Sequence, residues 1–236
     1  MSGTLHHTNF FIEAKYQSIL ERTSLFGSIP SDELQALLGC LAPRVQQFAA
    51  NGLIFAEGSP AGQMGLVLHG SVQIVQEDFY GNRHIIAALG PGELFAEAFA
   101  CAGTAALPVS VFAVQECTVL LLDAARILHP CQNACRFHQK AVLNLLQSMA
   151  SRNLQMNQKL WLLSRKTTQQ KLMAYFSAQA KAAGSREFSI PFNRQQLADY
   201  LGVERSAMCC ELSKLQSKGC LTARKNSISL LREWEE

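Results

Sequence analysis

One stretch, residues 193–221 (NRQQLADYLGVERSAMCCELSKLQSKGCL), constrains the fold of this chain more than any other. Asn193 and Gln196 form a capping box, which satisfies the free backbone N–H groups at the start of a helix. Gly202 then ends that short helix, because a residue without a Cβ adopts a left-handed turn at no steric cost. A second helix is expected to begin near Glu204. Two short helices joined by a tight turn predict a helix-turn-helix, the arrangement whose second helix enters the major groove of DNA.

The residues that follow predict a wing. Residues 222–231 (TARKNSISLL) alternate and carry Lys225-Asn226 where a hairpin would turn. Arg205 is the side chain in the second helix that is able to make a bidentate contact with guanine O6 and N7. The candidate base-contacting residues are Arg205, Ser206, Cys209 and Cys210, and the candidate phosphate contacts are Arg194, Gln195, Lys214 and Lys225.

Nothing in the chain predicts export or a membrane span. The 236 residues contain no long apolar run, and residues 1–11 are polar, unlike a signal peptide. The eight cysteines follow no regular spacing, so we expect reduced thiols in a cytosolic protein.

Charge is unevenly distributed along the chain. Residues 1–130 carry five Lys and Arg against eleven Asp and Glu, and residues 131–165 carry five basic residues and no acidic ones. Residues 166–236 carry eleven basic residues against seven acidic ones. Since phosphate neutralisation dominates DNA affinity, this distribution is typical of an acidic sensor joined to a basic nucleic-acid-binding part.

The first half of the chain changes character near Ala50. Residues 15–47 are expected to be helical, with a cap at Ser31. Short apolar or alternating runs separated by glycine turns follow, at residues 53–55, 65–68, 72–75, 84–87 and 119–122. Many short strands with glycine turns favour a small antiparallel barrel or sandwich.

Residues 136–163 predict one long helix with a coiled-coil seam. Two interleaved series recur every seven residues: Val142, Met149, Met156 and Leu163, and Leu146, Asn153 and Leu160. This pattern favours a parallel homodimer, in which a single seam asparagine fixes the register and the two-stranded state. The alternative is that these residues pack on the roll of their own chain.

The expected fold class is α+β. An antiparallel, jelly-roll-like β-roll sensor domain is expected over residues 1–135, a dimerisation helix and hinge over 136–165, and a winged helix over 166–236. Thr167 and Gln170, just after the hinge, form a second capping box.

The run FAEGSPAGQMGLVLHGSVQIVQEDFYGNRHIIAALGPGELF, followed by a long helix and a winged helix, resembles the Crp/Fnr superfamily of bacterial transcription regulators. The most specific matches are Glu57-Gly58, Gly70-Ser71-Val72, Gly92-Glu93-Leu94-Phe95 and the helix-turn-helix. The resemblance implies a cyclic-nucleotide-binding-type roll and a dimer that reads an inverted repeat in double-stranded DNA under the control of an effector, with RNA polymerase as a partner.

The effector region departs from the cyclic-nucleotide branch of that superfamily. The branch carries Gly-Glu and, about ten residues later, an Arg-Ser pair whose arginine binds the cyclic phosphate. This chain has Ala96-Glu97 and Leu107-Pro108 at these places. Because a buried phosphate without a cation is costly, we expect no cAMP site. The candidate effector-pocket residues, which line an apolar cavity or fill a core, are Phe95, Glu97, Phe99, Leu107 and Val109.

The resemblance also bears on DNA reading. In the same branch a glutamate, able to accept from cytosine N4, commonly follows the arginine that Arg205 matches. This chain has Ser206 at that position, so we expect the flanking bases to be read loosely.

Two other interpretations stay open. Cys131 and Cys135, flanked by His129 and His138, have a spacing that could chelate zinc or iron or sense oxidation, or they pack as small hydrophobes. Haem bound by a histidine is a further alternative, and the cofactor stays unassigned.

A cupin-like metalloenzyme is the alternative from another class of protein. It would need several clustered ligands, whereas the roll offers only the isolated His69 and His84. Since no Ser/His/Asp or paired-carboxylate constellation stands out either, we expect no enzyme.

Overall fold

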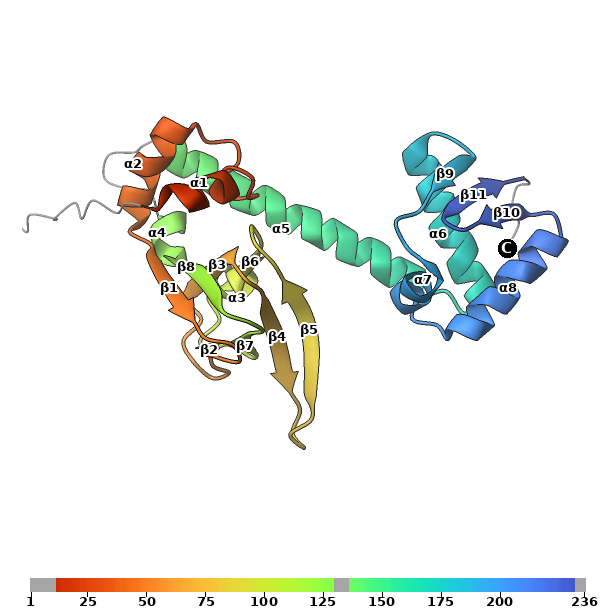
Figure 1. Cartoon of the computed structure of the whole chain (residues 1–236), viewed down its shortest axis with the longest axis horizontal. Helices are drawn as coiled ribbons and strands as arrows, with labels where there is room; N and C mark the ends of the chain where they lie inside the picture. The colour runs from red at the N-terminus through yellow and green to blue at the C-terminus, as the bar shows by residue number, and fades with distance from the viewer. Residues whose placement is uncertain (1–11, 130–135, 232–236) are drawn as a thin grey trace, which may run out of the picture. The chain divides into compact units, whose positions relative to one another are not determined.

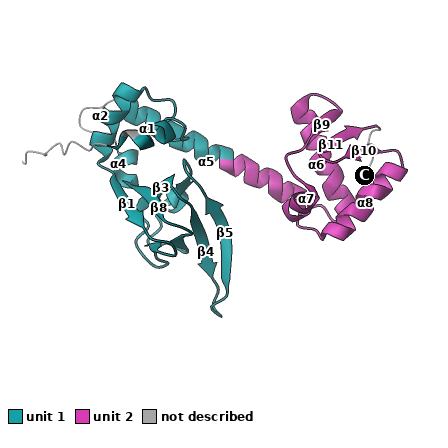
Figure 2. Ribbon diagram, in the orientation of Figure 1, with its two compact units in different colours: residues 1–151 teal, residues 152–236 magenta. Residues whose placement is uncertain are grey.

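The computed structural model describes residues 12–129 and 136–231. The chain divides into two compact units, residues 1–151 and 152–236 (Figure 2). The long helix α5 (Arg136–Leu163) has the bounds predicted for it and contributes to both units. None of the helices in these described ranges is long and apolar enough to cross a membrane.

Unit 1 contains two four-stranded antiparallel sheets (Figure 1), which confirms the predicted roll. The strand orders are β1-β8-β3-β6 and β2-β7-β4-β5. The strands are β1 (Arg44–Phe48), β2 (Leu53–Phe55), β3 (Gln63–His69), β4 (Val72–Glu77), β5 (Arg83–Leu89), β6 (Leu94–Phe95), β7 (Ser110–Ala113) and β8 (Cys117–Asp123). The helices are α1 (Ala14–Leu20), α2 (Ser31–Leu41), α3 (Glu97–Ala102) and α4 (Ala124–Leu128).

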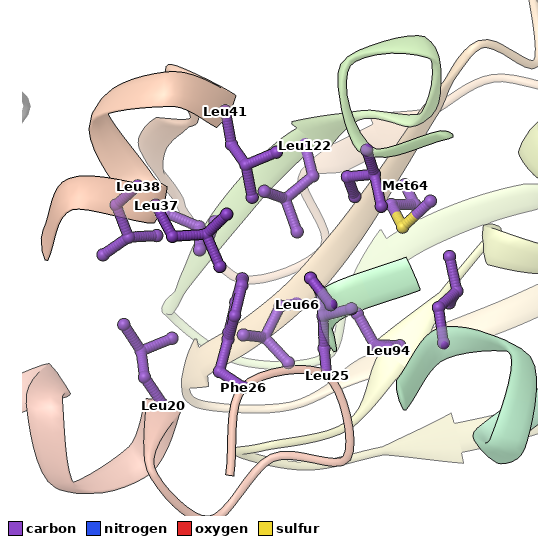
Figure 3. Packing of buried hydrophobic residues seen from close by; sticks show 14 of the residues in the cluster. Leu20, Leu25, Phe26, Leu37, Leu38, Leu41, Met64, Leu66, Leu94 and Leu122 are labelled. Carbon is purple, nitrogen blue, oxygen red and sulfur yellow. The ribbon is translucent and has the colours of Figure 1, made fainter. Parts of the chain in front are cut away.

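The central strands β3 and β8 are buried on both faces, which explains their continuous apolar sequences. Side chains alternate between the faces of a strand. Leu66 and Leu122 therefore pack with the helices in one core, where Leu37 of α2 and Phe26 also lie (Figure 3). Val119 and its neighbours on the opposite face fill a second core inside the roll.

The expected helix over residues 15–47 is corrected by the structure. It is interrupted between α1 and α2, and its last residues form strand β1, paired with β8. β1 has the sequence RVQQF and is mostly exposed, so it carries no apolar alternation that would indicate a strand. Pro30 rather than Ser31 occupies the N-cap of α2, and the Ser31 hydroxyl donates to the Glu21 carboxylate over 2.7 Å.

Helix α2 ends in a residue that is strained. Ala42 has a left-handed conformation (φ 43°, ψ 57°), which an L-residue with a Cβ adopts at a cost of roughly 1–2 kcal/mol. We expect Ala42→Gly to raise the free energy of unfolding by about 1 kcal/mol. The same change at Ala36, exposed in the middle of α2, should lower it by about 0.5–1 kcal/mol. Denaturant unfolding measures both, and a loss of stability in both variants would contradict the strain.

Unit 2 is a winged helix, as predicted. It contains α6 (Thr168–Ala183), β9 (Glu187–Ser189), α7 (Arg194–Leu201), α8 (Arg205–Ser217), β10 (Leu221–Arg224) and β11 (Ser227–Leu230). The three strands form one antiparallel sheet of order β10-β11-β9. Its core joins Phe176 of α6, Leu201 of α7 and Met208 of α8, and Leu162 at the end of α5 is buried among them.

Candidate nucleic-acid interface and effector region

Local contacts fix the helix pair α7 and α8. At the start of α7, Asn193 and Gln196 exchange the two hydrogen bonds of the predicted capping box, each 2.9 Å long. Gly202 ends α7 with φ +59°, and a Cβ added there would lie 3.3 Å from Leu163 Cδ2. The Lys171 ammonium of α6 also donates to the carbonyl of Leu201 over 3.2 Å. These contacts hold the turn before α8 in place.

Helix α8 begins at an unusual cap, the carboxylate of Glu204. Its Oε1 accepts from the backbone N–H of Ser206 (2.9 Å), and its Oε2 accepts from that of Ala207 (2.8 Å) and from the Ser206 hydroxyl. The hydrogen bond from the Ser206 side chain, followed by those from the backbone, holds the pKa of this carboxyl below its usual range. Sequence reasoning placed the helix start here but missed the cap, because glutamate is not among the preferred N-cap residues.

Three of the four candidate base-contacting residues are exposed on the first turns of α8. These are Arg205, Ser206 and Cys210. The expected outward position of Cys209 is corrected, since Cys209 is half-buried and packs against the core of unit 2. Cys209 and Cys210 are adjacent on the helix, so the first lies toward the core and the second lies on the surface.

The candidate phosphate contacts lie on three elements of unit 2. Arg194 and Gln195 open α7, where the Gln195 amide donates to Asp199 over 2.8 Å. Lys214, on α8, forms an ion pair with Glu211 at 2.7 Å. Lys225 is exposed in the two-residue turn of the wing, between β10 and β11.

A hollow that sequence reasoning did not find lies beside α8. Its volume is about 470 Å³, and it is lined by Thr167, Thr168, Gln169, Ala207, Cys210 and Glu211. The first turn of α6 is therefore adjacent to the exposed thiol of α8. No sequence signal could have indicated this, because the two segments are joined only by the tertiary fold.

The candidate effector residues lie mainly in packed interior. Phe95 and Leu107 belong to the core inside the roll, and Phe99 packs against it half-buried. A Cβ at Gly65 would overlap the Phe95 ring, so glycine is required there for the ring to fit. Val109 is also buried.

Glu97 lies in this region as a buried charged residue. Its exposed fraction is 5%, at the start of α3. Burial, with the Glu97 charge as a second cause, raises the pKa of the Cys101 thiol one turn later in the helix. Ala96, where the cyclic-nucleotide branch has glycine, is held left-handed with φ 60°. Of the candidate effector residues, Phe95, Glu97, Leu107 and Val109 are thus buried, and Phe99 is half-buried.

The seam residues of α5 fall into two groups. Val142 and Met149 are half-buried and pack against the core of unit 1, and Leu163 is half-buried. Leu146, Asn153, Met156 and Leu160 are exposed, with exposed fractions of 62% for Leu146 and 61% for Leu160. Part of the predicted seam is therefore engaged within the chain, and part is free.

The described residues contain no group of three or more His, Cys, Asp or Glu side chains that could hold a metal ion. Cys131 and Cys135 lie outside those residues. His138 is buried, with Nε2 bonded to the Ile127 carbonyl at 2.8 Å. His69 and His84 lie on different sheets, on β3 and β5.

The two parts of the chain match two family models. Residues 45–133 match the cyclic nucleotide-binding domain, and residues 161–234 match the Crp-like helix-turn-helix domain. An effector-binding roll followed by a winged helix defines a DNA-binding transcription regulator rather than an enzyme. The chain belongs to the Crp/Fnr family of these regulators. The comparison with curated proteins gives no match.

Solved structures share this fold. The catabolite activator protein of Thermus thermophilus is 23% identical, with 88% of this chain and 93% of that one covered and a TM-score of 0.52. DNR from Pseudomonas aeruginosa is 21% identical, with 95% and 97% covered and a TM-score of 0.51.

Proposed function

We propose that the chain acts as a homodimer that binds an inverted-repeat operator, with its affinity controlled by an effector in the roll other than a cyclic nucleotide. The observation that carries the DNA-binding mode is Arg205, exposed in the first turn of the capped helix α8. Within the described part of the chain, no hydrogen bond or ion pair occupies its guanidinium, so its donors are available to a guanine edge.

The proposed division of labour follows the sequence. Residues 1–135 would sense the effector, residues 136–165 would dimerise and act as a hinge, and residues 166–236 would bind DNA. RNA polymerase is the proposed protein partner. The wing and the start of α7 would contact phosphates through Lys225, Arg194 and Gln195, which position the protein without reading sequence.

The proposed dimer seam is a refined one. Val142 and Met149 pack against the core of unit 1 and are not available to a partner protomer. On that side of α5, the exposed residues are the next ones along the chain, Leu143 and Ala150. The free stripe has six side chains, which are all exposed and are separated alternately by three and four residues: Leu143, Leu146, Ala150, Asn153, Asn157 and Leu160. This is the spacing of a two-stranded coiled coil. The Asn157 amide donates to Asn153 Oδ1 over 2.9 Å, so two successive positions of this stripe form a hydrogen-bonded polar pair.

The proposal that the effector is not a cyclic nucleotide rests on residue 107 and its surroundings. Leu107 is buried, and its backbone bonds with Gly58 and Ser59. A cyclic phosphate near it would lose its hydration without gaining a cation, and a buried anion without a partner is strongly disfavoured.

We expect cAMP and cGMP to bind with dissociation constants of about 1 mM or weaker, equivalent to about −4 kcal/mol. Isothermal titration calorimetry of the full chain measures this for both nucleotides. Glu97→Gln is the matched control, because a ribose contact at Glu97 would weaken on this change whereas nonspecific heat would not. Micromolar binding of either nucleotide that Glu97→Gln weakens would contradict the proposal.

The operator is tested by selection from a random DNA duplex library with the full chain. We expect enrichment of an inverted repeat whose half-sites are separated by whole helical turns, each with one strongly specified G·C pair. Enrichment of a single, unrepeated site would contradict the homodimer, and the absence of any enriched sequence would contradict specific DNA binding.

A further inference from the structure

The cap of the recognition helix α8 has a longer side chain than the usual one. Short polar residues and glycine are preferred at this position, and glutamate is not among them. Here the longer Glu204 side chain folds back to the helix and brings a full negative charge to its N-terminus. This end of a recognition helix lies nearest the base edges in a helix-turn-helix complex. A carboxylate stabilises the start of a helix, but here it also lies on a DNA-binding surface, where phosphates repel it.

The hydrogen bonds of the Glu204 carboxylate leave it one favourable acceptor site. An ionised carboxylate has about four lone-pair sites. Oε2 uses two, for the Ala207 N–H and the Ser206 hydroxyl, and Oε1 uses one, for the Ser206 N–H. The remaining site belongs to Oε1 of an exposed side chain whose geometry is already fixed by three bonds. It can accept one hydrogen bond and donate none.

The contact with Ser206 places this carboxylate beside the residues of α8 that are expected to contact bases. Ser206 stands where the cyclic-nucleotide branch commonly has a base-reading glutamate, and a serine hydroxyl alone reaches less far. In this chain the Ser206 hydroxyl is bonded to Glu204, so an acid from two residues earlier lies at the same turn of the helix. Arg205, between them, is free of hydrogen bonds and ion pairs within the described residues. A donor-only and an acceptor-only group therefore lie side by side.

We propose that Glu204 determines specificity by selecting a base that presents an amino group in the major groove, cytosine N4 or adenine N6, beside the guanine contacted by Arg205. These amino groups are the hydrogen-bond donors of the major groove, whereas guanine O6 and thymine O4 are acceptors that a carboxylate repels. The charge that weakens binding to DNA in general is thus compensated only on the right base. This inference rests on the proposed function, and it differs from the expectation that every flanking base is read loosely.

The test is a binding-site selection on the full-length dimer, comparing wild type with Glu204→Ser and Glu204→Gln. Serine is a good N-cap, so it preserves the helix while removing the charge and the reach. For wild type we expect cytosine or adenine to be preferred roughly fivefold or more at a position adjacent to the specified guanine. In Glu204→Ser that preference should fall to near equality, while the guanine stays specified and binding to random DNA becomes severalfold tighter at low salt.

Glu204→Gln keeps the shape of the side chain and adds an amide donor. It should therefore admit thymine or guanine at the same position, which a merely structural cap would not do. An unchanged preference in both variants, or no amino-bearing base next to the guanine in wild type, overturns the inference and leaves the proposed function standing. If wild type enriches no sequence at all, the proposed function itself fails. Retention of the specified guanine in each variant reports that the winged helix is folded.

Discussion

Replacing Leu160 by glutamate is expected to convert the dimer to a monomer at micromolar concentration. Leu160 belongs to both possible seam series and is exposed, so the change leaves the core of either unit intact. In the dimer it would place two like charges face to face in an apolar layer. Leaving buried charges uncompensated costs about 3–5 kcal/mol, which raises the dissociation constant roughly 100-fold or more. Sedimentation velocity measures the result directly.

Matched variants on the same helix make this result specific. Gln158→Glu introduces the same side chain at an exposed position outside both seam series and should leave the dimer intact. Ala150→Glu should dissociate it and Met156→Glu should not, if the seam is the refined one. The reverse pattern would restore the original series, and a Leu160→Glu variant that remains dimeric would rule out a seam on α5. Met149→Glu is a poorer test, because Met149 packs against the core of its own unit.

Replacing Arg205 by alanine is expected to erase selectivity at one base pair in each half-site. The bidentate contact to guanine contributes about 1–3 kcal/mol, and this loss occurs in both half-sites of a dimer. The helix itself should persist, because its cap at Glu204 and its buried Met208 and Leu212 are unchanged. Binding-site selection and titration of the best duplex report the two effects.

The control for Arg205→Ala is Lys225→Ala, in the turn of the wing. Lys225 is expected to contact phosphate alone, so its loss should weaken all sequences alike and flatten the dependence of affinity on salt. The assignment of Arg205 is falsified if Arg205→Ala keeps the wild-type sequence preference while losing affinity uniformly, as Lys225→Ala should.

Local signals made the DNA-binding unit predictable. The capping boxes at Asn193 and Thr167, the left-handed glycines that end the helices and the two-residue wing turn all depend on neighbours within a few residues. Each can therefore be recognised without knowing the rest of the fold.

The strands that the sequence did not predict, β1, β6 and β7, depend on residues far away in the chain. Strand β1 exists because Arg44 to Phe48 pair with β8, more than sixty residues away, while its own side chains are mostly exposed. In β6 and β7 the strands are too short to show a period. Pairing partners, rather than composition, make these segments strands.

The free face of α5 could not be derived from periodicity alone. The heptad series that begins at residue 142 is the more apolar one in the sequence, and only the structure shows that the core of unit 1 engages its Val142 and Met149. The same holds for the adjacent thiols Cys209 and Cys210, since a helix pattern with 3.6 residues per turn leaves a residue at the edge of the buried face undetermined.

The hydrogen-bonded pair Asn153 and Asn157 would also affect which protomers this regulator forms dimers with in a cell. A protomer with apolar side chains at these positions would bury the two amides while leaving part of their hydrogen-bonding capacity unmet. Two copies of this chain would instead align amide with amide. The polar pair would thus act as a sorting code among related protomers, excluding mixed pairs at the expense of some strength in the matched one.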